Sequence, residues 1–376
     1  MIGQKGLPAL SGGIERHVED LATRLVRNGH EVIVYCRSSY AQNRPKATDY
    51  KGIRCITIPT IPGKNLETVI QTFFASIHAL FMRADIIHYH GIGPSLFAWI
   101  PRMCVPNVRV IATFHCQDYF HQKWGALARM AFRLGEVVAC TVTHRTIAVS
   151  ETIREYIKKT YGRDAAYLPN AVPLRTREND DTHIRRLRLE AQDYILLVSR
   201  LVRHKNIHFV IKAYNELVSG GALLPKLAIV GSSCHTDDYE SELRNLAGGN
   251  PNIFFAGEQT SETLAQLYSH ARIFVHASCS EGLSYAILEA MSYGCPVLVS
   301  DIAENKEILH AVGTTFKTNN SEDFMKQLNL LLESQDTHKT CALDYSRVID
   351  EHYNVETVFS NMLSLYVGLS PRQRHS

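Results

Sequence analysis

Residues 273–301 read IFVHASCSEGLSYAILEAMSYGCPVLVSD, and this stretch decides the fold class. Two apolar runs, IFVHAS and PVLVS, flank a segment in which Ile287, Leu288 and Met291 fall on one helical face. A strand, a helix and a second strand in this order form a βαβ unit, whose strands run parallel and are covered on both faces. The stretch therefore predicts an α/β protein.

The same alternation runs through the rest of the chain. The apolar runs expected to form strands are EVIVYC, IRCITIP, DIIHYH, VRVIATFH and TIAVS in the first half, and YILLVSR, KLAIVG, NIFFAG, IFVHAS and PVLVS in the second. Between the halves, residues 168–183 (LPNAVPLRTRENDDTH) are rich in Pro, Asn, Arg and Asp, which is typical of a linker. We therefore predict two Rossmann-like, doubly wound domains that face a cleft, over 1–170 and 171–345. A helical tail over 346–376 follows, with apolar residues that can pack on either domain or cross back to the first.

Composition places the chain among folded proteins without a spanning helix. Its 376 residues are 45% hydrophobic and 20% charged, which suits two packed domains. No apolar run of about 18 residues and no signal-peptide pattern is present, so we expect a cytoplasmic protein. Its nine cysteines include no C-x-x-C pair, so neither a disulfide framework nor a thiolate metal site is predicted.

Charge is distributed unevenly along the chain. Residues 1–170 carry 21 Lys and Arg against 12 Asp and Glu, whereas the remainder carries 19 against 25. A basic half suits contact with anionic lipid or nucleic acid, or is simply a solvated surface. The helical stretches 65–85 and 124–144 carry aromatic and aliphatic residues with Arg129 and Arg133 nearby. They either touch an anionic membrane peripherally or face the core.

A glycine-rich loop precedes the first predicted helix, which spans residues 14–28. Ser11, Gly12 and Gly13 stand at its start, where backbone N–H groups have no intrahelical partner and the dipole favours an anion. Glycine also lets a phosphate approach the backbone without a Cβ in the way. The alternative is a plain strand-to-helix turn capped by Ser11 or Gly12. The G-x-G-x-x-G spacing is absent, which disfavours nicotinamide binding.

Two glutamates lie at a suggestive spacing in the stretch quoted first. Glu281 and Glu289 are eight residues apart, at most about 12 Å along a helix axis. Carboxylates so spaced suit hydroxyls at both ends of a nucleotide sugar, with the N–H groups of Leu283 and Ser284 facing the phosphates. The alternative is a capping glutamate followed by an exposed helical one.

A basic pair follows the first strand of the second half. Arg200 and Lys205 lie in VSRLVRHKNI, residues 198–207. Paired cations at a strand end can hold a diphosphate and stabilise the charge that builds on it as it leaves. Isolated basic residues in a loop are otherwise only solvated. Their occurrence together with the glycine loop and the spaced glutamates favours a binding site.

Taken together, these motifs resemble the retaining GT-B glycosyltransferases of family 4. The resemblance rests on SGGIERHVEDLA, on R-x4-K at Arg200 and Lys205, and on E-x7-E at Glu281 and Glu289, and it covers nearly the whole chain. The opening MIGQKGLPALSGGIERHVEDLA is most similar to bacterial members that build O-antigen, capsule or exopolysaccharide, some of them rhamnosyl- or mannosyltransferase-like. The implied reaction moves a hexose from a nucleoside-diphosphate sugar to a glycan or polyprenyl-diphosphate-linked acceptor with retention, and the leaving phosphate takes the acceptor proton.

The resemblance also implies roles for individual residues. It assigns His115, Arg200, Lys205 and Glu281 to catalysis, and Gly12, Gly13, Arg200, Lys205, Glu281, Gly282, Leu283, Ser284 and Glu289 to donor binding. Within that set Glu281 contacts the transferred sugar, Glu289 contacts the ribose, and His115 reaches the donor sugar from the end of VRVIATFH. Asp118, in the same loop, and His90, in HYHGIG, are weaker candidates near the sugar or the acceptor. A structural role explains His90 more readily.

No Asp-x-Asp pair lies at a suitable strand end, so we expect no metal cofactor. Cations and helix starts would neutralise the departing diphosphate instead. The basic first half is expected on the acceptor side, with an anionic membrane as a peripheral partner and no nucleic acid. The alternatives are another GT-B enzyme, such as a sugar-nucleotide 2-epimerase, and a non-catalytic scaffold of a polysaccharide assembly complex. The intact Arg200, Lys205, Glu281 and Glu289 argue against the scaffold.

Two features depart from the family pattern. The sequence Gly231-Ser232-Ser233-Cys234 stands where relatives have a glycine-rich turn, which weakens any inference about how the base is held. The first strand is cut to Met1-Ile2, so either the chain starts further upstream or this edge of the sheet is short.

Overall fold

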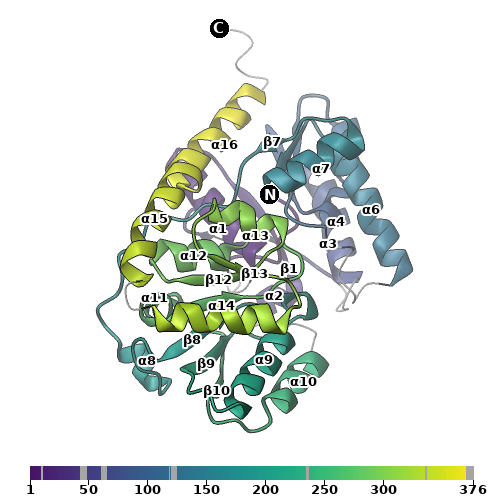
Figure 1. The fold of residues 1–376 in the computed structure, drawn as a ribbon. Coiled ribbons are helices and arrows are strands. Elements are labelled where there is room, and N and C mark those ends of the chain that lie inside the picture. The colour runs from purple at the N-terminus through teal and green to yellow at the C-terminus, as the bar shows by residue number, and fades with distance from the viewer. Residues whose placement is uncertain are drawn as a thin grey trace. The chain divides into compact units, whose positions relative to one another are not determined.

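A computed structural model of the chain describes residues 1–9, 12–42, 49–60, 66–117, 119, 125–233, 237–334 and 337–369. The chain divides into two compact units (Figure 1). Unit 1 contains Met1–Asn170 and Glu356–Ser376, and unit 2 contains Ala171–Val355. In both units parallel strands alternate with helices, which confirms the predicted class of two Rossmann-like domains. All ten strands predicted from apolar runs are present.

The sheet of unit 1 consists of two parts joined by the first residues of the chain. Their strand orders are β1-β3-β2 and β4-β5-β6-β7. The strands are β1 (Ile33–Arg37), β2 (Asp49–Tyr50), β3 (Ile53–Ile58), β4 (Ile86–His90), β5 (Arg109–Phe114), β6 (Arg145–Ala148) and β7 (Ala166–Tyr167). Ile2 pairs with Tyr89 of β4, and the N–H of Tyr35 in β1 donates to the Met1 carbonyl at 3.1 Å. Of the two alternatives for Met1-Ile2, the short sheet edge is contradicted, because these first residues lie inside the sheet and are hydrogen-bonded on both sides.

The helices of unit 1 come from both ends of the chain. They are α1 (Gly13–Arg27), α2 (Ser38–Gln42), α3 (Leu66–Ala79), α4 (Ile92–Ser95), α5 (Trp99–Cys104), α6 (Ala126–Thr141), α7 (Glu151–Tyr161) and α16 (Val355–Leu369). The buried face of α1 contains Val18, Leu21 and Leu25, as its apolar spacing predicts. These residues share one core with Met362 and Tyr366 of α16, so the C-terminal helix is part of the first unit.

Unit 2 is built on one parallel sheet of order β10-β9-β8-β11-β12-β13. Its strands are β8 (Tyr194–Val198), β9 (Lys226–Val230), β10 (Ile253–Gly257), β11 (Ile273–His276), β12 (Val297–Ser300) and β13 (Thr314–Phe316). Its helices are α8 (Thr182–Arg186), α9 (Ile207–Ser219), α10 (Asp237–Ala247), α11 (Ser261–His270), α12 (Tyr285–Ser292), α13 (Ala303–Leu309), α14 (Ser321–Glu333) and α15 (Thr337–His352), together with the 3-10 turn η2 (Arg203–Lys205). The boundary predicted at residue 345 falls within α15, which contacts α12 and belongs to unit 2.

Topology determines which loops meet. Strands β8 and β11 are parallel neighbours in unit 2, as are β4 and β5 in unit 1. Parallel neighbours end at the same edge of a sheet, which is where ligands bind in open α/β folds.

The eight described cysteines are free thiols, and Cys234 lies outside the described residues. Within the described part of the chain, no helix is both long and apolar enough to cross a bilayer.

Candidate active site

Lys205 and Glu281 form an ion pair in unit 2 although 76 residues separate them in sequence. Lys205 ends the turn η2 after β8, and Glu281 lies in the loop between β11 and α12. The backbone N–H of Cys279 donates to the His204 carbonyl at 2.8 Å, which fixes one loop against the other. The Lys205 side chain is 13% exposed and that of Glu281 9%, so the pair has little contact with water.

His276 completes the arrangement around one carboxylate oxygen. It is the last residue of β11 and is buried, and its Nε2 lies 2.7 Å from Oε1 of Glu281, the atom that also accepts from Lys205. Burial lowers the pKa of His276 although Glu281 favours its charged form, so the neutral ring donates its Nε2–H. Burial alone would raise the pKa of Glu281, but the charge of Lys205 and the His276 hydrogen bond hold it well below 4.5. Glu281 is therefore a carboxylate at neutral pH.

The two oxygens of Glu281 have different surroundings. Oε1 accepts from both Lys205 and His276, whereas no described residue hydrogen-bonds Oε2. A charged carboxylate is an acceptor only, and each oxygen has more than one acceptor position. Oε2 is thus available to a hydroxyl group, while Lys205 and His276 keep the side chain in one orientation.

Arg200 lies in the turn after β8 and is half-buried. Within the described chain its guanidinium makes no ion pair or hydrogen bond, whereas the nearby Arg203 pairs with Glu242. A guanidinium without a carboxylate partner keeps all its donors for an anion. The charge of Arg203 is neutralised by Glu242, whereas the charge of the predicted cation Arg200 is not neutralised by any described carboxylate.

Gly231 begins the segment that departs from the family pattern, and its position requires glycine. Its φ is +130°, and a Cβ there would lie 1.9 Å from the carbonyl oxygen of Ser199. Only glycine allows so close an approach of the two backbones. Just beyond, the N–H of Leu201 donates to the Ser232 carbonyl at 3.0 Å. The segment after β9 therefore supports the turn that carries Arg200.

The remaining predicted donor-binding residues of unit 2 lie at the start of α12. Gly282 and Leu283 are buried in the loop, and Ser284 is the N-cap residue, but its side chain makes no capping hydrogen bond. Glu289 lies within α12, where the Tyr268 hydroxyl donates to its Oε2 at 3.3 Å. Glu289 is thus held by a buried tyrosine and is not the freely exposed helical glutamate of the alternative reading.

In unit 1, Gly12 is the N-cap residue of α1, with φ +103°. A Cβ at this position would lie 2.2 Å from Oε2 of Glu15, so a side chain here would displace that carboxylate. Gly13 is exposed, and no described side chain caps the helix. The first N–H groups of α1 therefore lack a side-chain cap, as the sequence predicts, while Ser11 lies outside the described residues.

The acidic residues of α1 have a structural use. Oε1 of Glu15 accepts from the backbone N–H of Lys5 at 3.0 Å, and Oε2 of Glu19 accepts from that of Ala9 at 2.6 Å. Both carboxylates therefore hold the segment before the glycine loop against the first turns of the helix. They also satisfy backbone donors that the segment would otherwise leave unpaired.

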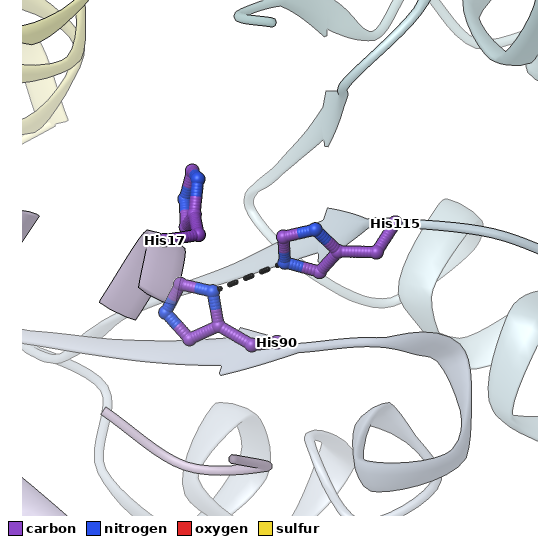
Figure 2. A group of neighbouring side chains, drawn as sticks. All are labelled: His17, His90 and His115. Atoms are coloured by element: carbon purple, nitrogen blue, oxygen red, sulfur yellow. Dashed lines mark hydrogen bonds between the residues drawn. The ribbon is translucent and has the colours of Figure 1, made fainter. Parts of the chain in front are cut away.

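His115 and His90 lie side by side because β4 and β5 are neighbours. Nδ1 of His90 lies 3.4 Å from Nε2 of His115, and His17 of α1 packs edge-on against both rings (Figure 2). All three are buried. Burial, with smaller contributions from neighbouring imidazoles, lowers the pKa of His90 and His115 well below 6.5, and burial lowers that of His17 to about 4. The rings are neutral at pH 7. Asp118 lies outside the described residues.

Sequence reasoning did not select His276 or His17. His276 lies inside the predicted strand IFVHAS, five residues before Glu281, so the rule that strand ends gather at one sheet edge pointed to this strand but did not single out the histidine. His17 lies on a helix, and only the tertiary structure brings it to the ends of β4 and β5.

Two family models together match most of the chain. "Glycosyltransferase Family 4" matches residues 11–176, and "Glycosyl transferases group 1" matches residues 179–343. The chain belongs to the GT-B glycosyltransferases of family 4. The predicted family is confirmed.

Relatives of this family 4 glycosyltransferase act in several settings. An uncharacterized glycosyltransferase of Methanocaldococcus jannaschii is 25% identical over 80% of each chain. The O-antigen chain mannosyltransferase of Salmonella typhimurium is 30% identical over 54% of this chain and 53% of its own. The D-inositol 3-phosphate glycosyltransferase of Rhodococcus erythropolis is 24% identical over 78% and 72%.

Solved structures share the fold. Sucrose-phosphate synthase from Thermosynechococcus elongatus has a TM-score of 0.83 at 20% identity, covering 98% of this chain and 97% of that one. The Anabaena protein HepE in complex with UDP-glucose has a TM-score of 0.79 at 17% identity, covering 98% of both chains. At these identities the similarity establishes the GT-B architecture of this family 4 glycosyltransferase, and nothing about its substrates.

Proposed function

We propose that this glycosyltransferase moves a hexose from a nucleoside-diphosphate sugar to a hydroxyl of a glycan or polyprenyl-diphosphate-linked acceptor, with retention and without a metal cofactor. The biological setting is assembly of a bacterial O-antigen, capsule or exopolysaccharide. The observation that carries the proposal is the oriented, charged Glu281 between Lys205 and His276. Arg200, in the turn that also leads to Lys205, has no ion pair with any described residue. Support for the setting comes from the O-antigen mannosyltransferase among the relatives.

The residues of unit 2 suit the chemistry of the donor. Arg200 and Lys205 bind the diphosphate and stabilise the negative charge that grows on it as the bond to the sugar breaks. Oε2 of Glu281 accepts a hydrogen bond from a hydroxyl of the transferred sugar. Glu289 accepts from the ribose. The acceptor hydroxyl bonds to the anomeric carbon on the face that the diphosphate leaves, and its proton passes to the departing phosphate oxygen.

The roles proposed for unit 1 follow the resemblance. Gly12 and Gly13 receive the diphosphate at the uncapped start of α1, and His115 hydrogen-bonds the donor sugar. A neutral imidazole suits this task because it donates from one nitrogen and accepts at the other. His90 supports His115 through their 3.4 Å contact. Asp118 stays a candidate near the sugar or the acceptor on the resemblance alone.

We extend the proposal to peripheral contact with the cytoplasmic face of an anionic membrane. Six apolar side chains of unit 1 are more than half exposed, namely Phe74, Phe81, Met103, Leu127, Met130 and Leu134. They lie on or beside α3, α5 and α6, and α4 contacts both α3 and α6 (Figure 1). We call these six residues the apolar surface. The exposed Arg129 and Arg133 on α6 would face lipid phosphates. Because the six side chains are exposed, the core-facing alternative does not hold for them.

The test is incubation of the purified protein with UDP-, GDP- and dTDP-sugars in the presence of EDTA. One donor is expected to raise the melting temperature and to release its nucleoside diphosphate only when an acceptor is added. Epimerised sugar without acceptor would identify the rival enzyme. Absence of turnover with every donor and a lipid-linked acceptor mixture would support the scaffold instead.

A further inference from the structure

Three imidazole rings converge in unit 1 from three separate elements. His17 comes from α1, His90 from the end of β4, and His115 from the residue after β5 (Figure 2). One ring nitrogen from each lies within 4.8 Å of the corresponding nitrogens of the other two. All three side chains are buried and their backbones belong to, or directly adjoin, regular structure. The cluster is therefore held by a stiff framework.

One distance in the cluster already suits a metal ion. Zn²⁺ binds imidazole nitrogen at about 2.0–2.1 Å, so two ligands of a tetrahedral ion lie about 3.4 Å apart. Nδ1 of His90 and Nε2 of His115 lie 3.4 Å apart. The 4.8 Å limit for His17 means that its ring has to move inward when an ion binds.

The surroundings of His90 favour the same interpretation. Its Nδ1 faces His115, and its Nε2 is buried without a hydrogen-bond partner among the described residues, so no hydrogen bond at Nε2 holds the ring in another orientation. Its ring packs against that of His88, with centroids 4.1 Å apart and the planes tilted by 35°. Both nitrogens of His88 are engaged, by Tyr366 at 2.6 Å and by Thr113 at 2.7 Å. His88 thus supports His90 and is not itself a free ligand.

We infer that His17, His90 and His115 form a binding site for a transition-metal ion of the Zn²⁺ class. Three neutral imidazoles are the ligand set that zinc and its neighbours prefer, and the fourth position is left to water. The ion is not a cofactor for transfer. Because it occupies His115, which the proposed function assigns to the donor sugar, a bound ion inhibits transfer, and this consequence rests on that proposed function.

The experiment titrates the full-length, metal-free protein with Co²⁺ and follows the visible spectrum. The wild type is expected to bind one equivalent and to develop the intense bands of four-coordinate cobalt, which Zn²⁺ then abolishes. His17→Ala is expected to weaken binding at least a hundredfold. The matched control is His352→Ala, which breaks the stacked pair of His310 and His352 in unit 2, with centroids 3.8 Å apart, and should bind like the wild type.

Circular dichroism and thermal melting establish that each variant is folded. Absence of the four-coordinate spectrum, or its persistence in His17→Ala, overturns the site. In transfer assays Zn²⁺ should inhibit the wild type and leave His17→Ala active, and equal inhibition of both removes the inhibitory role. If no transfer is detected for any variant, the proposed function fails, while the cobalt spectrum still decides the metal site.

Discussion

Lys205 and His276 bind the same oxygen of Glu281, Lys205 through an ion pair and His276 at 2.7 Å. Two donors on one oxygen fix the carboxylate and leave the other oxygen to the ligand. Glu281 is therefore the residue whose replacement tests the site most directly.

Replacement of Glu281 should abolish transfer. In Glu281→Gln the shape is kept, but the charge that orients Lys205 and accepts the sugar hydroxyl is lost, so kcat/KM should fall by more than about a hundredfold, or roughly 3 kcal/mol. Glu281→Ala should behave alike. Glu242→Gln is the control, since it removes a carboxylate that pairs with the exposed Arg203. Full activity in Glu281→Ala with a native circular dichroism spectrum would remove the assignment.

The same ion pair should show strong coupling in stability. Glu281→Gln leaves the Lys205 ammonium, 13% exposed, without its counter-charge and should lower the free energy of unfolding by about 2 kcal/mol. Lys205→Met should do the same by stranding the carboxylate. The double variant should regain most of the loss, because no isolated charge remains, yet stay inactive. Urea unfolding measures the cycle, and additive losses would show that the two charges do not interact.

The lowered pKa of Glu281 predicts that the free energy of unfolding depends on pH. Its pKa in the folded protein lies well below the ordinary 4.5, so below pH 4.5 the unfolded chain binds a proton that the folded chain does not. Its contribution is complete above pH 4.5 and declines as the pH falls toward the folded-state pKa. The stability difference between wild type and Glu281→Gln should thus be constant from pH 5 to 7 and shrink at lower pH, by at most about 1.4 kcal/mol per pH unit. A difference that grows on acidification contradicts the ion pair.

Gly231 should tolerate no side chain. In Gly231→Ala the new Cβ meets the Ser199 carbonyl oxygen at 1.9 Å, so the turn carrying Arg200 must shift. We expect a loss of more than about 3 kcal/mol of stability or a raised KM for the donor. Gly249→Ala is matched, with φ +72° and no atom within 4 Å of its Cβ, and should cost about 1 kcal/mol. Equal effects of both variants on stability and donor KM would mean that only backbone strain matters.

The apolar surface should bind anionic vesicles. Leu127→Gln combined with Leu134→Gln removes two side chains that are 76% and 51% exposed, so co-sedimentation with phosphatidylglycerol vesicles should weaken about tenfold with little change in stability. Leu223→Gln, at a fully exposed position of unit 2, is the control. Binding that persists in the double variant and disappears in high salt would assign the contact to charge alone.

Much of the architecture followed from local pattern. Apolar runs identified the ten strands, because strands covered on both faces need continuous apolar sequence. The short strands β2, β7 and β13 escaped, since two or three residues carry no periodic signal. The central position of the segment around Ile2 was not predicted either. Its pairing with β4 depends on residues almost ninety positions away, which no local pattern encodes.

The sequence predicted which residues form the site but not how their side chains are arranged. Spacing and resemblance selected Arg200, Lys205 and Glu281, but neither showed that Lys205 and Glu281 meet, which follows from β8 and β11 being neighbours. His276 and His17 were missed because a lone histidine has no distinctive spacing. Their significance comes from what the tertiary structure places beside them.

The contribution of α16 to unit 1 has a consequence for folding. Met362 and Tyr366 complete a core whose first buried member is Leu7, so the first unit needs residues from both ends of the chain. Unit 2, by contrast, is continuous in sequence. Unit 1 therefore completes its core only when the last helix of the described chain is available, whereas unit 2 needs no residue beyond Val355. Until that helix is available, the apolar side chains that Met362 and Tyr366 cover in the folded unit have no partner from α16.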